Sequence, residues 1–181
     1  MHRLLALSVA LLVSFSANAG DDFKLEPGFV LLFNGKNLDG WKTRKGGEAL
    51  DGKTEAYKGR FKVDDGKLII DPKVRGDVII DTAKPLVGDV HIKFEFLPGK
   101  GCNNDLFIRG LKFDLVKQQV KSIKEGEWNK FEIVIKGKKA EFLCNGQVAR
   151  STTVKNASSV LGVRAEFGPV EIRRLRAKMT D

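Results

Sequence analysis

The stretch Val-His-Ile-Lys-Phe-Glu-Phe at residues 90–96 decides the fold, because its apolar side chains recur at every second position. A strand places successive side chains on opposite faces of a sheet, so this alternation predicts a strand with one buried and one solvated face. The same period of two recurs at residues 131–135 and 170–173. After the first twenty residues the chain shows hardly any helical period, which favours a protein built from strands.

Further short apolar or alternating segments predict additional strands. They lie at residues 61–64, 67–70, 78–80, 106–109, 111–116, 140–144 and 160–167. Turns separate them, among them Asp65-Gly66 and Asn145-Gly146, since these residue types tolerate a positive φ. Roughly ten or eleven short strands without crossover helices predict an all-β fold, an antiparallel two-sheet sandwich of jelly-roll type. Residues 44–57 are rich in Gly and charge, and we expect a long surface loop there.

The N-terminal segment has the pattern of a secretory signal peptide. Arg3 provides the positive start, residues 4–15 form an apolar core too short to span a bilayer, and Ala17-Asn18-Ala19 provides a cleavage site with small residues. Removal of residues 1–19 leaves 181 − 19 = 162 residues, so we expect residues 20–181 to form a single domain. The expected location is secreted or periplasmic. No second apolar run is long enough to span a membrane.

The charge of the chain is clearly basic but evenly distributed. The sequence contains 32 Lys and Arg against 23 Asp and Glu, and loss of the signal peptide changes the balance from +9 to 31 − 23 = +8. Many Lys residues occupy alternating strand positions, as expected for a solvated sheet face. The densest basic group lies at residues 173–178 and has no interleaved aromatic residue. The pattern therefore predicts no nucleic-acid partner.

Two cysteines, Cys102 and Cys144, leave two alternatives open. In an oxidising compartment they could form one disulfide, which would pin the Gly-rich loop around Cys102 to a neighbouring strand. They could equally be separate buried thiols, a common state for Cys. The sequence does not place their Cα atoms within bonding distance of each other.

Residues 32–41 read Leu-Phe-Asn-Gly-Lys-Asn-Leu-Asp-Gly-Trp and combine a strand end, two polar turns and an aromatic anchor at Trp41. Together with several later segments, this motif resembles the 3-keto-disaccharide hydrolase domain family. The segments that carry the resemblance are residues 28–41, 61–68, 88–96, 102–110, 113–116, 126–129, 131–146 and 170–175. They span nearly all of the chain after the signal peptide.

The resemblance implies a concanavalin-like or laminarinase-like jelly roll that acts on a carbohydrate or an oxidised glycoside. Enzymes of this family cleave glycosides whose sugar is oxidised at carbon 3. The ketone acidifies the neighbouring C2 hydrogen, so that a base can start elimination of the glycosidic group and water can then add. Such chemistry needs a base, a proton donor for the departing oxygen and a group that stabilises the enolate.

Carried over from the family, the expected catalytic residues are Asp114 and Arg109, and the expected substrate-binding residues are Asn103 and Asn104. We expect Asn103, Arg109 and Asp114 to converge on one concave face. Each residue also has a structural alternative. Asn103 could hold a loop turn, Arg109 could form a salt bridge with Asp114, and Asp114 could be a solvated carboxylate on a strand.

Three departures from the family pattern keep a non-catalytic alternative open. Asn104-Asp105 replaces the family's Ser-Gly, and Val116 replaces a Gln. Only the twelve residues 116–127 precede Trp128, where family members carry a longer insertion that walls the sugar site. Without that wall the groove is open to water, which weakens the electrostatic interactions that stabilise a transition state. The alternative is a carbohydrate-binding or structural jelly-roll domain that has lost this loop.

The sequence predicts no metal and no other cofactor. His2 lies in the signal peptide, and His91 has no His or Cys neighbour at ligand spacing, so we expect a solvated or hydrogen-bonded strand residue. The sequence does not support a Ca²⁺ ion either. Among the aromatic residues, Trp41 and Trp128 are expected to pack in the core, and Tyr57 is expected in the exposed loop.

Overall fold

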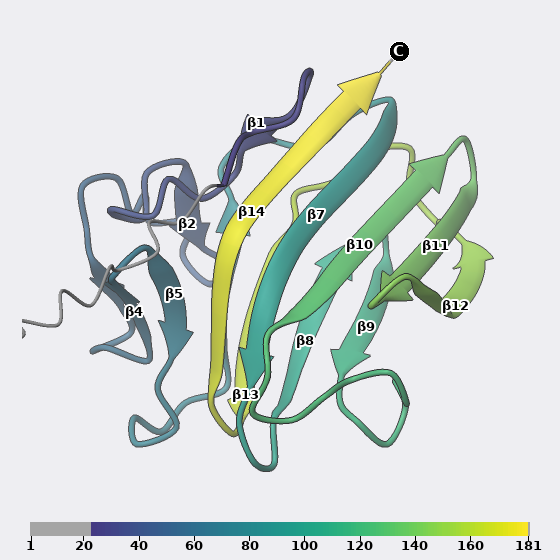
Figure 1. The fold of residues 1–181 in the computed structure, drawn as a ribbon. Helices are drawn as coiled ribbons and strands as arrows, with labels where there is room; N and C mark the ends of the chain where they lie inside the picture. Colours follow the sequence, from purple (N-terminus) through teal and green to yellow (C-terminus); the bar gives the residue numbers. More distant parts are fainter. Residues whose placement is uncertain (1–22, 181) are drawn as a thin grey trace, which may run out of the picture.

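The structure is a computed structural model that describes residues 23–180. Fourteen strands form two antiparallel sheets that pack against each other as a sandwich (Figure 1). The predicted all-β antiparallel fold is therefore confirmed. Within the described range, no helix has the length and apolar character needed to cross a membrane. The predicted signal peptide, residues 1–19, lies outside the described residues.

The larger sheet has nine strands, with the order β12-β11-β10-β7-β14-β5-β4-β3, and β1 pairs with the second half of β14. Its two longest strands, β7 and β14, lie side by side at its centre (Figure 1). The strands are β1 (Val30–Leu31), β3 (Glu55–Ala56), β4 (Phe61–Asp64), β5 (Lys67–Ile70), β7 (Asp89–Pro98), β10 (Asn129–Lys136), β11 (Lys139–Cys144), β12 (Gln147–Thr153) and β14 (Val170–Thr180).

The smaller sheet has five strands in the order β2-β6-β13-β8-β9. The strands are β2 (Trp41–Thr43), β6 (Val78–Thr82), β8 (Asn103–Ile108), β9 (Leu111–Leu115) and β13 (Gly162–Phe167). We call the sides that face away from the core the nine-stranded face and the five-stranded face. Of the fourteen strands, β1 and β3 are only two residues long, and β12 carries no alternating apolar signal, so the sequence did not predict it.

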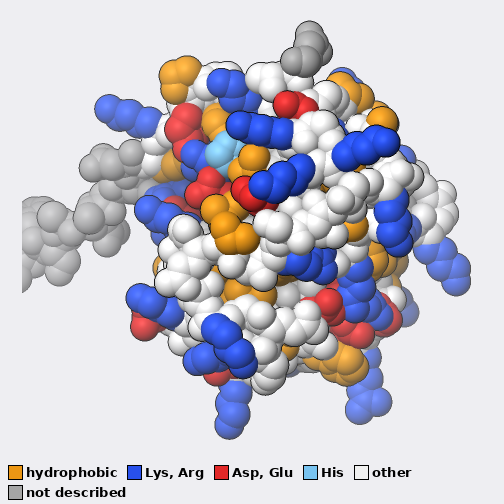
Figure 2. All heavy atoms as spheres, turned by 90° about the vertical axis from the view of Figure 1, so that its right-hand side faces the viewer, with side chains coloured by type: hydrophobic (Ala, Val, Ile, Leu, Met, Phe, Trp, Pro, Cys, Tyr) orange, Lys and Arg blue, Asp and Glu red, His pale blue; other side chains and the backbone are white. Residues whose placement is uncertain are grey.

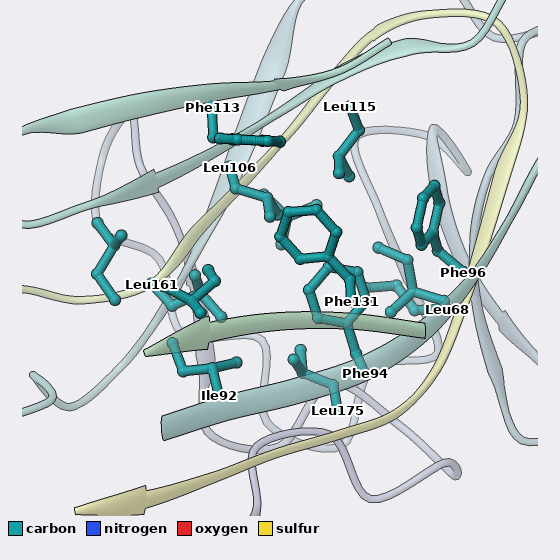
Figure 3. Packing of buried hydrophobic residues seen from close by; sticks show 14 of the residues in the cluster. Leu68, Ile92, Phe94, Phe96, Leu106, Phe113, Leu115, Phe131, Leu161 and Leu175 are labelled. Carbon is teal, nitrogen blue, oxygen red and sulfur yellow. The ribbon is translucent and has the colours of Figure 1, made fainter. Parts of the chain in front are cut away.

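Alternation along the strands places the apolar side chains between the sheets. Phe113 of β9 lies 4.5 Å from Phe142 of β11 and 5.2 Å from Phe131 of β10, measured between ring centroids. Phe131 in turn contacts Phe94 of β7 at 5.1 Å. Figure 3 shows Phe113 and Phe131 pointing toward each other from opposite sheets. Aromatic rings from both sheets thus form one core, and each buried ring stabilises the fold by about 2–3 kcal/mol.

Three hairpins use two-residue turns in which both residues have a positive φ: Asp65-Gly66, Arg109-Gly110 and Asn145-Gly146. This backbone matches the right-handed twist of the paired strands, so it is the preferred short hairpin turn. Asp and Asn tolerate the left-handed conformation well. Arg109, with a φ of 49°, does not have that tolerance, and the conformation costs about 1 kcal/mol.

The segment 44–57 is less open than predicted. Leu50 is buried within it, and its last residues form the short strand β3. Tyr57 is half-buried instead of exposed, because it packs against the core and its hydroxyl donates to the carbonyl oxygen of Ile79 at 3.1 Å. A segment rich in Gly and charge can still contribute a core residue, and the sequence pattern did not show which one.

The two tryptophans differ in their surroundings. Trp41 is fully buried as predicted, and its Nε1 donates to the carbonyl oxygen of Leu32 at 2.8 Å. Trp128 is only half-buried, so the prediction of core packing was wrong. The guanidinium of Arg173 lies 4.0 Å above its ring, a cation–π contact that covers the ring from outside.

Cys102 and Cys144 are free, buried thiols, so the disulfide alternative is not formed. The Cys102 thiol donates to the carbonyl oxygen of Leu115 at 3.6 Å. Burial raises the pKa of both thiols. The thiol form is therefore favoured at neutral pH, which makes both side chains weak nucleophiles.

The surface carries its charge in mixed form. Figure 2 shows Lys and Arg side chains spread over the visible side of the molecule, with Asp and Glu among them and apolar groups in small patches. Exposed ion pairs of this kind are ordinary for a solvated sheet surface, and each contributes at most about 1 kcal/mol to stability. The two outer faces differ in how these charges are arranged.

Candidate functional site

The five-stranded face presents a row of polar and aromatic side chains along β8. Leu106 and Ile108 are buried in the core, so the alternating residues Asn103, Asp105 and Phe107 point to the outer side. On the neighbouring strand β9, Phe113 is buried in the core, and the residues on either side of it point outward in the same way. This face therefore collects functional groups from adjacent strands.

Two carboxyl groups lie directly opposite each other on this face. Asp105 of β8 and Asp114 of β9 are cross-strand partners in the antiparallel register. Arg164 Nη1 lies 2.7 Å from Asp105 Oδ2, and Lys112 Nζ lies 2.7 Å from Asp114 Oδ1 and 3.4 Å from Asp105 Oδ2. Like charges in directly opposed positions are unfavourable, so two cations and a shared proton are needed to hold this pair together.

The two carboxyl groups have unequal surroundings. The Asp105 side chain is fully buried, and burial raises its pKa more than the bond to Arg164 lowers it. Asp114 is about one-fifth exposed; burial raises its pKa less than the hydrogen bonds from Lys112 and Asp105 lower it, so its pKa lies below the usual value. Of the two, Asp105 therefore holds a proton more readily, and Asp114 loses its proton more readily.

Asp105 Oδ1 supports this assignment. This oxygen is buried and meets no hydrogen-bond donor among residues 23–180. A buried acceptor without a donor costs about 1–3 kcal/mol. A proton on Asp105 removes that cost, because the carboxyl group can then donate to Asp114. The geometry thus favours one proton shared by the pair.

Arg164 anchors the buried member of the pair. Besides Asp105, its guanidinium contacts Asp77 Oδ2 at 2.5 Å and Glu166 Oε1 at 3.1 Å. Hydrogen bonds to Asp77 and Asp105 raise the pKa of Arg164, so it is positively charged at every relevant pH. The cation is fixed by three carboxylates from three different segments, and it therefore holds its position beside Asp105.

Aromatic side chains lie toward both ends of the β8 row. Arg44 stacks 4.6 Å above the ring of Phe107 and forms an ion pair with Asp81. Toward the other end, Phe167 of β13 is the register partner of Asn103, and 62 % of its surface is exposed. Asn103 Oδ1 is buried without a hydrogen-bond partner among the described residues. An exposed ring beside an unsatisfied amide is well suited to contact a sugar.

The structural alternative in which Arg109 forms a salt bridge with Asp114 is not observed. Arg109 lies in the turn between β8 and β9 and is 2 % exposed. Its Nη2 donates to the carbonyl oxygens of Gly88 at 2.6 Å and Leu86 at 3.4 Å, in the loop between β6 and β7. Asp114 instead pairs with Lys112 on its own strand. The predicted convergence of Asn103, Arg109 and Asp114 therefore fails at Arg109.

Asn104 also has a different role from the predicted contact with substrate. It points toward the core and is 1 % exposed. Its Nδ2 donates to the carbonyl oxygen of Phe167 at 3.0 Å, and its Oδ1 accepts from the backbone N–H of Glu166 at 2.8 Å. These bonds bridge the irregular register between β8 and β13, so Asn104 holds the sheet together. Asn103, by contrast, lies on the five-stranded face beside the pair.

The sequence contained one overlooked signal for Asp105. When Arg109-Gly110 is taken as a two-residue turn, Ile108 pairs with Leu111. Each step away from the turn on both strands gives the next pair, so the third step pairs Asp105 with Asp114. The carboxyl pair could therefore have been predicted from the turn. Arg164 had no such signal, because it reaches the site from β13, fifty-nine positions further along the chain.

The segment between β9 and β10 does not extend as a free loop. Val120 and Ile123 are buried, and the amide of Asn145 donates to the carbonyl oxygen of Ser122 at 2.8 Å. Asn129 is buried, and its Nδ2 donates to the carbonyl oxygen of Lys124 at 2.8 Å. The segment is thus tied back onto the core and the β11–β12 hairpin by its own side chains and backbone.

His91 lies on the nine-stranded face, away from the carboxyl pair. Its Nε2 is 2.7 Å from Glu132 Oε2, and its ring contacts Phe29 edge-on, so the expected hydrogen-bonded strand residue is confirmed. Across residues 23–180 there is no group of three or more His, Cys, Asp or Glu side chains that could hold a metal ion.

The chain matches one protein family over much of this structure. Residues 28–120, or 93 of 181, match the family described as "3-keto-alpha-glucoside-1,2-lyase-like domain". This match includes β8, β9 and both members of the carboxyl pair. The chain belongs to this family. No curated protein sequence matches this member of the lyase-like family.

Solved structures resemble the lyase-like domain in fold. A crystal structure of a "putative glycosyl hydrolase" from Parabacteroides distasonis is 18 % identical, covers 85 % of this chain and 95 % of that chain, and has a TM-score of 0.67. A second protein of the same description and organism is 12 % identical, with coverage of 84 % and 99 % and a TM-score of 0.64. The carbohydrate binding module CBM66 from Bacillus subtilis is 10 % identical, with coverage of 77 % and 95 % and a TM-score of 0.50.

Proposed function

We propose that this domain acts on a carbohydrate held against the five-stranded face, and that Asp114 is the base that cleaves a glycoside oxidised at carbon 3. The observation that carries the proposal is the directly opposed, unequal pair of Asp105 and Asp114. Paired titratable groups whose surroundings separate their pKa values are typical of acid–base sites. Family membership indicates the class of reaction.

The dimensions of the face suit a substrate of about two sugar rings. Asn103 and Phe107 lie four positions apart on β8, which corresponds to ~13 Å along a strand. Asp105 is midway between them. Phe167 beside Asn103 offers an exposed ring for one sugar, and the Arg44 guanidinium stacked on Phe107 lies at the position of the next. The bond between the two sugars would then lie above the carboxyl pair.

The elimination can be written with the side chains of this face. The Asp114 carboxylate takes the C2 proton, which the ketone at C3 acidifies. The electron pair of that C–H bond forms a C2=C3 bond, and the carbonyl π electrons move onto the C3 oxygen, which becomes the enolate. When the enolate collapses, the ketone is restored and the C1=C2 double bond forms while the C1–O bond breaks, so that the glycosidic oxygen leaves with the electrons of that bond. The departing oxygen then receives the proton that Asp114 took. Water adds across the enone in the last step.

Two neighbouring side chains support the proton abstraction and the enolate. Lys112 is 44 % exposed and contacts Asp114 at 2.7 Å, so its ammonium group can approach the enolate oxygen that forms at C3. Asp105 is fully buried and touches no substrate. It is a positioning residue, because its proton orients Asp114 and keeps a second negative charge away from the site.

The predicted signal peptide extends the proposal to a location outside the cytoplasm. In this view residues 1–19 direct export, and the domain meets its glycoside in the periplasm or the medium. Fractionation of cells that express the full chain with a C-terminal tag tests this point. Loss of residues 1–19 would be visible as a mass difference in the exported protein.

The experiment that tests the proposed reaction is incubation of residues 20–181 with 3-keto-trehalose and with a 3-keto-glucoside. We expect release of the second sugar by the wild type and its loss in Asp114→Asn. Glu132→Gln, which changes a carboxylate of the nine-stranded face, is the matched control and should turn over normally. No release from any oxidised glycoside, or equal release by Asp114→Asn, would contradict the assignment.

A non-catalytic carbohydrate-binding domain is the second candidate. It is favoured by the segment between β9 and β10, which is tied back to the core through Val120 and Ile123 and does not add a tall wall to the face. The same experiment separates the two candidates. Saturable binding of an unoxidised glycan, weakened by Phe167→Ala and without turnover of any oxidised one, would favour the binding domain.

A further inference from the structure

A cavity of about 410 Å³ lies at the end of the sandwich where the β8–β9 turn, the β10–β11 turn and the loop after β12 meet. Arg109 forms part of its wall, together with Asp89, Lys138, Lys155 and Asn156. None of these residues takes part in the carboxyl pair described above. The cavity is therefore a separate feature of the molecule.

The side chain of Arg109 is a buried cation without a bound carboxylate. It is 2 % exposed, and its Nη2 already donates to two backbone carbonyl oxygens. No acceptor in residues 23–180 meets its Nε, which is buried, or its Nη1. A buried guanidinium with unused donors is costly unless an anion compensates it. An anionic group in the cavity would supply the missing acceptors.

The backbone at Arg109 gives a second, independent observation. The equivalent first positions of the other two-residue turns are Asp65 and Asn145, residue types that tolerate a positive φ. Arg109 adopts the same conformation against its intrinsic preference. Its carbonyl oxygen accepts hydrogen bonds from the backbone N–H groups of Lys155 and Asn156 at 3.0 and 3.3 Å. The strained turn thus fixes the loop after β12, which carries Lys155, beside the Arg109 guanidinium at the cavity.

The charge around the cavity is positive. Arg109, Lys138 and Lys155 contribute +3 and Asp89 contributes −1, which leaves +2. Asp89 is partly engaged, because its Oδ1 accepts the backbone N–H of Gly137 at 2.7 Å. Lys138 and Lys155 are exposed, and neither forms an ion pair within the described range. Both ammonium groups are therefore available to a ligand.

We propose that this cavity binds an anionic group, either a carboxylate or a tetrahedral oxoanion, with Arg109 as the buried donor and Lys138 and Lys155 as the exposed donors. Arg109 provides a planar fork whose free nitrogens match such an oxygen pair. The two lysines close the site from the solvent side. The site is independent of the reaction on the five-stranded face.

The test is calorimetric titration of residues 20–181 with inorganic phosphate, sulfate, acetate and glucuronate at constant ionic strength. Glucose is the uncharged control. We expect saturable binding of at least one anion and none of glucose. The double variant Lys138→Ala/Lys155→Ala should bind about tenfold more weakly, because it removes two exposed charge contacts. The double variant Lys36→Ala/Lys121→Ala, with two exposed lysines outside the cavity, should bind like the wild type.

Arg109→Lys keeps the charge but removes the fork, and we expect it to lose measurable binding. Its thermal unfolding is recorded in parallel, and the lysine double variant keeps the proposal testable if Arg109→Lys fails to fold. Tighter binding of glucuronate than of acetate would identify a charged sugar as the source of the anion, and tighter binding of phosphate would identify a free oxoanion. Absence of saturable binding, or equal weakening in both double variants, would overturn the proposal.

The backbone amides of Gly88 and Gly137 provide a second readout. Both line the cavity, so the bound anion should shift their amide resonances in the wild type. The amides of β8 on the five-stranded face should not move. Shifts confined to β8 and β9 would place the anion at the carboxyl pair and would also overturn the proposal.

Discussion

The two outer faces of the sandwich arrange their charged groups differently. On the nine-stranded face, Glu95 pairs with Arg173, Glu26 with Arg176 and Glu132 with His91, so each of these acids faces a basic partner. On the five-stranded face, two acids face each other across β8 and β9. Pairs of opposite charge on neighbouring strands are ordinary for a solvated sheet surface and need no functional explanation. An opposed carboxyl pair is unfavourable unless it holds a proton, which makes it the better candidate for chemistry.

The largest expected effect concerns Asp114. Asp114→Asn removes the base while it keeps the size of the side chain, so turnover of a 3-keto-glycoside should fall by about 10²–10⁴-fold. Glu132→Gln makes the same change on the nine-stranded face and should leave kcat/KM within about twofold of the wild type. A steady-state assay of sugar release checks both variants. Equal activities in the two would remove the functional distinction between the faces.

The next effect concerns the exposed ring of Phe167. Phe167→Ala should weaken binding of an oxidised disaccharide by about fivefold, because stacking on an aromatic ring contributes about 1 kcal/mol. Met179→Ala removes an exposed apolar side chain from β14 in the other sheet and is the matched control. Titration followed by calorimetry measures both affinities. A loss shared by both variants would point to a general effect on the fold.

Stability should respond in opposite ways on the two faces. Glu95→Gln removes the partner of Arg173 and Arg174, and we expect a loss of about 1 kcal/mol in the free energy of unfolding. Asp105 has a raised pKa in the folded state, so its contribution to stability falls as the pH rises above the unfolded value near 3.8. Asp105→Asn should therefore gain stability relative to the wild type between pH 4 and pH 7.

Urea unfolding at these two pH values checks both variants. A stability difference between Asp105→Asn and the wild type that does not change with pH would show that Asp105 is an ordinary ionised carboxylate.

The smallest effect concerns Glu26 on the nine-stranded face. Its hydrogen bond to Arg176 lowers the pKa of this carboxyl to about 2. The resulting stabilisation is present above pH 4.5 and is lost as the pH falls through 2. Because the side chain is 36 % exposed, we expect Glu26→Gln to cost less than about 1 kcal/mol at pH 6 and nothing at pH 2. Unfolding curves at both pH values, with and without added salt, measure the effect.

The sequence predicted the fold well because the two faces of a sheet produce an alternation of apolar and polar residues along each strand. The pattern at 90–96 and the turns at Asp65-Gly66 and Asn145-Gly146 correspond to β7 and to two observed hairpins. Short strands such as β3 were missed, because two residues carry no period. The half-buried Tyr57 was missed for a related reason, since its partner Ile79 is distant in the chain.

The site was predicted only in part. Asn103 and Asp114 lie on the five-stranded face, as the family resemblance implied, whereas Asn104 and Arg109 point elsewhere. Adjacent residues on a strand face opposite sides, so Asn103 and Asn104 could not both contact one ligand. The contribution of Arg164 depends on the pairing of β13 with β8, a contact between distant segments that no local pattern encodes.

The most direct test of the account is a carbon NMR titration of the Asp and Glu side-chain carboxyl groups in residues 20–181, with assignments from Asp105→Asn, Asp114→Asn and Glu132→Gln. We predict that Asp105 and Asp114 take up protons in two separate steps, one above and one below the usual value near 3.8. Addition of an oxidised disaccharide should move both resonances and leave Glu132 unchanged. A single step near 3.8 for both carboxyls, with no response to the sugar, would contradict the claim that this pair forms the functional site.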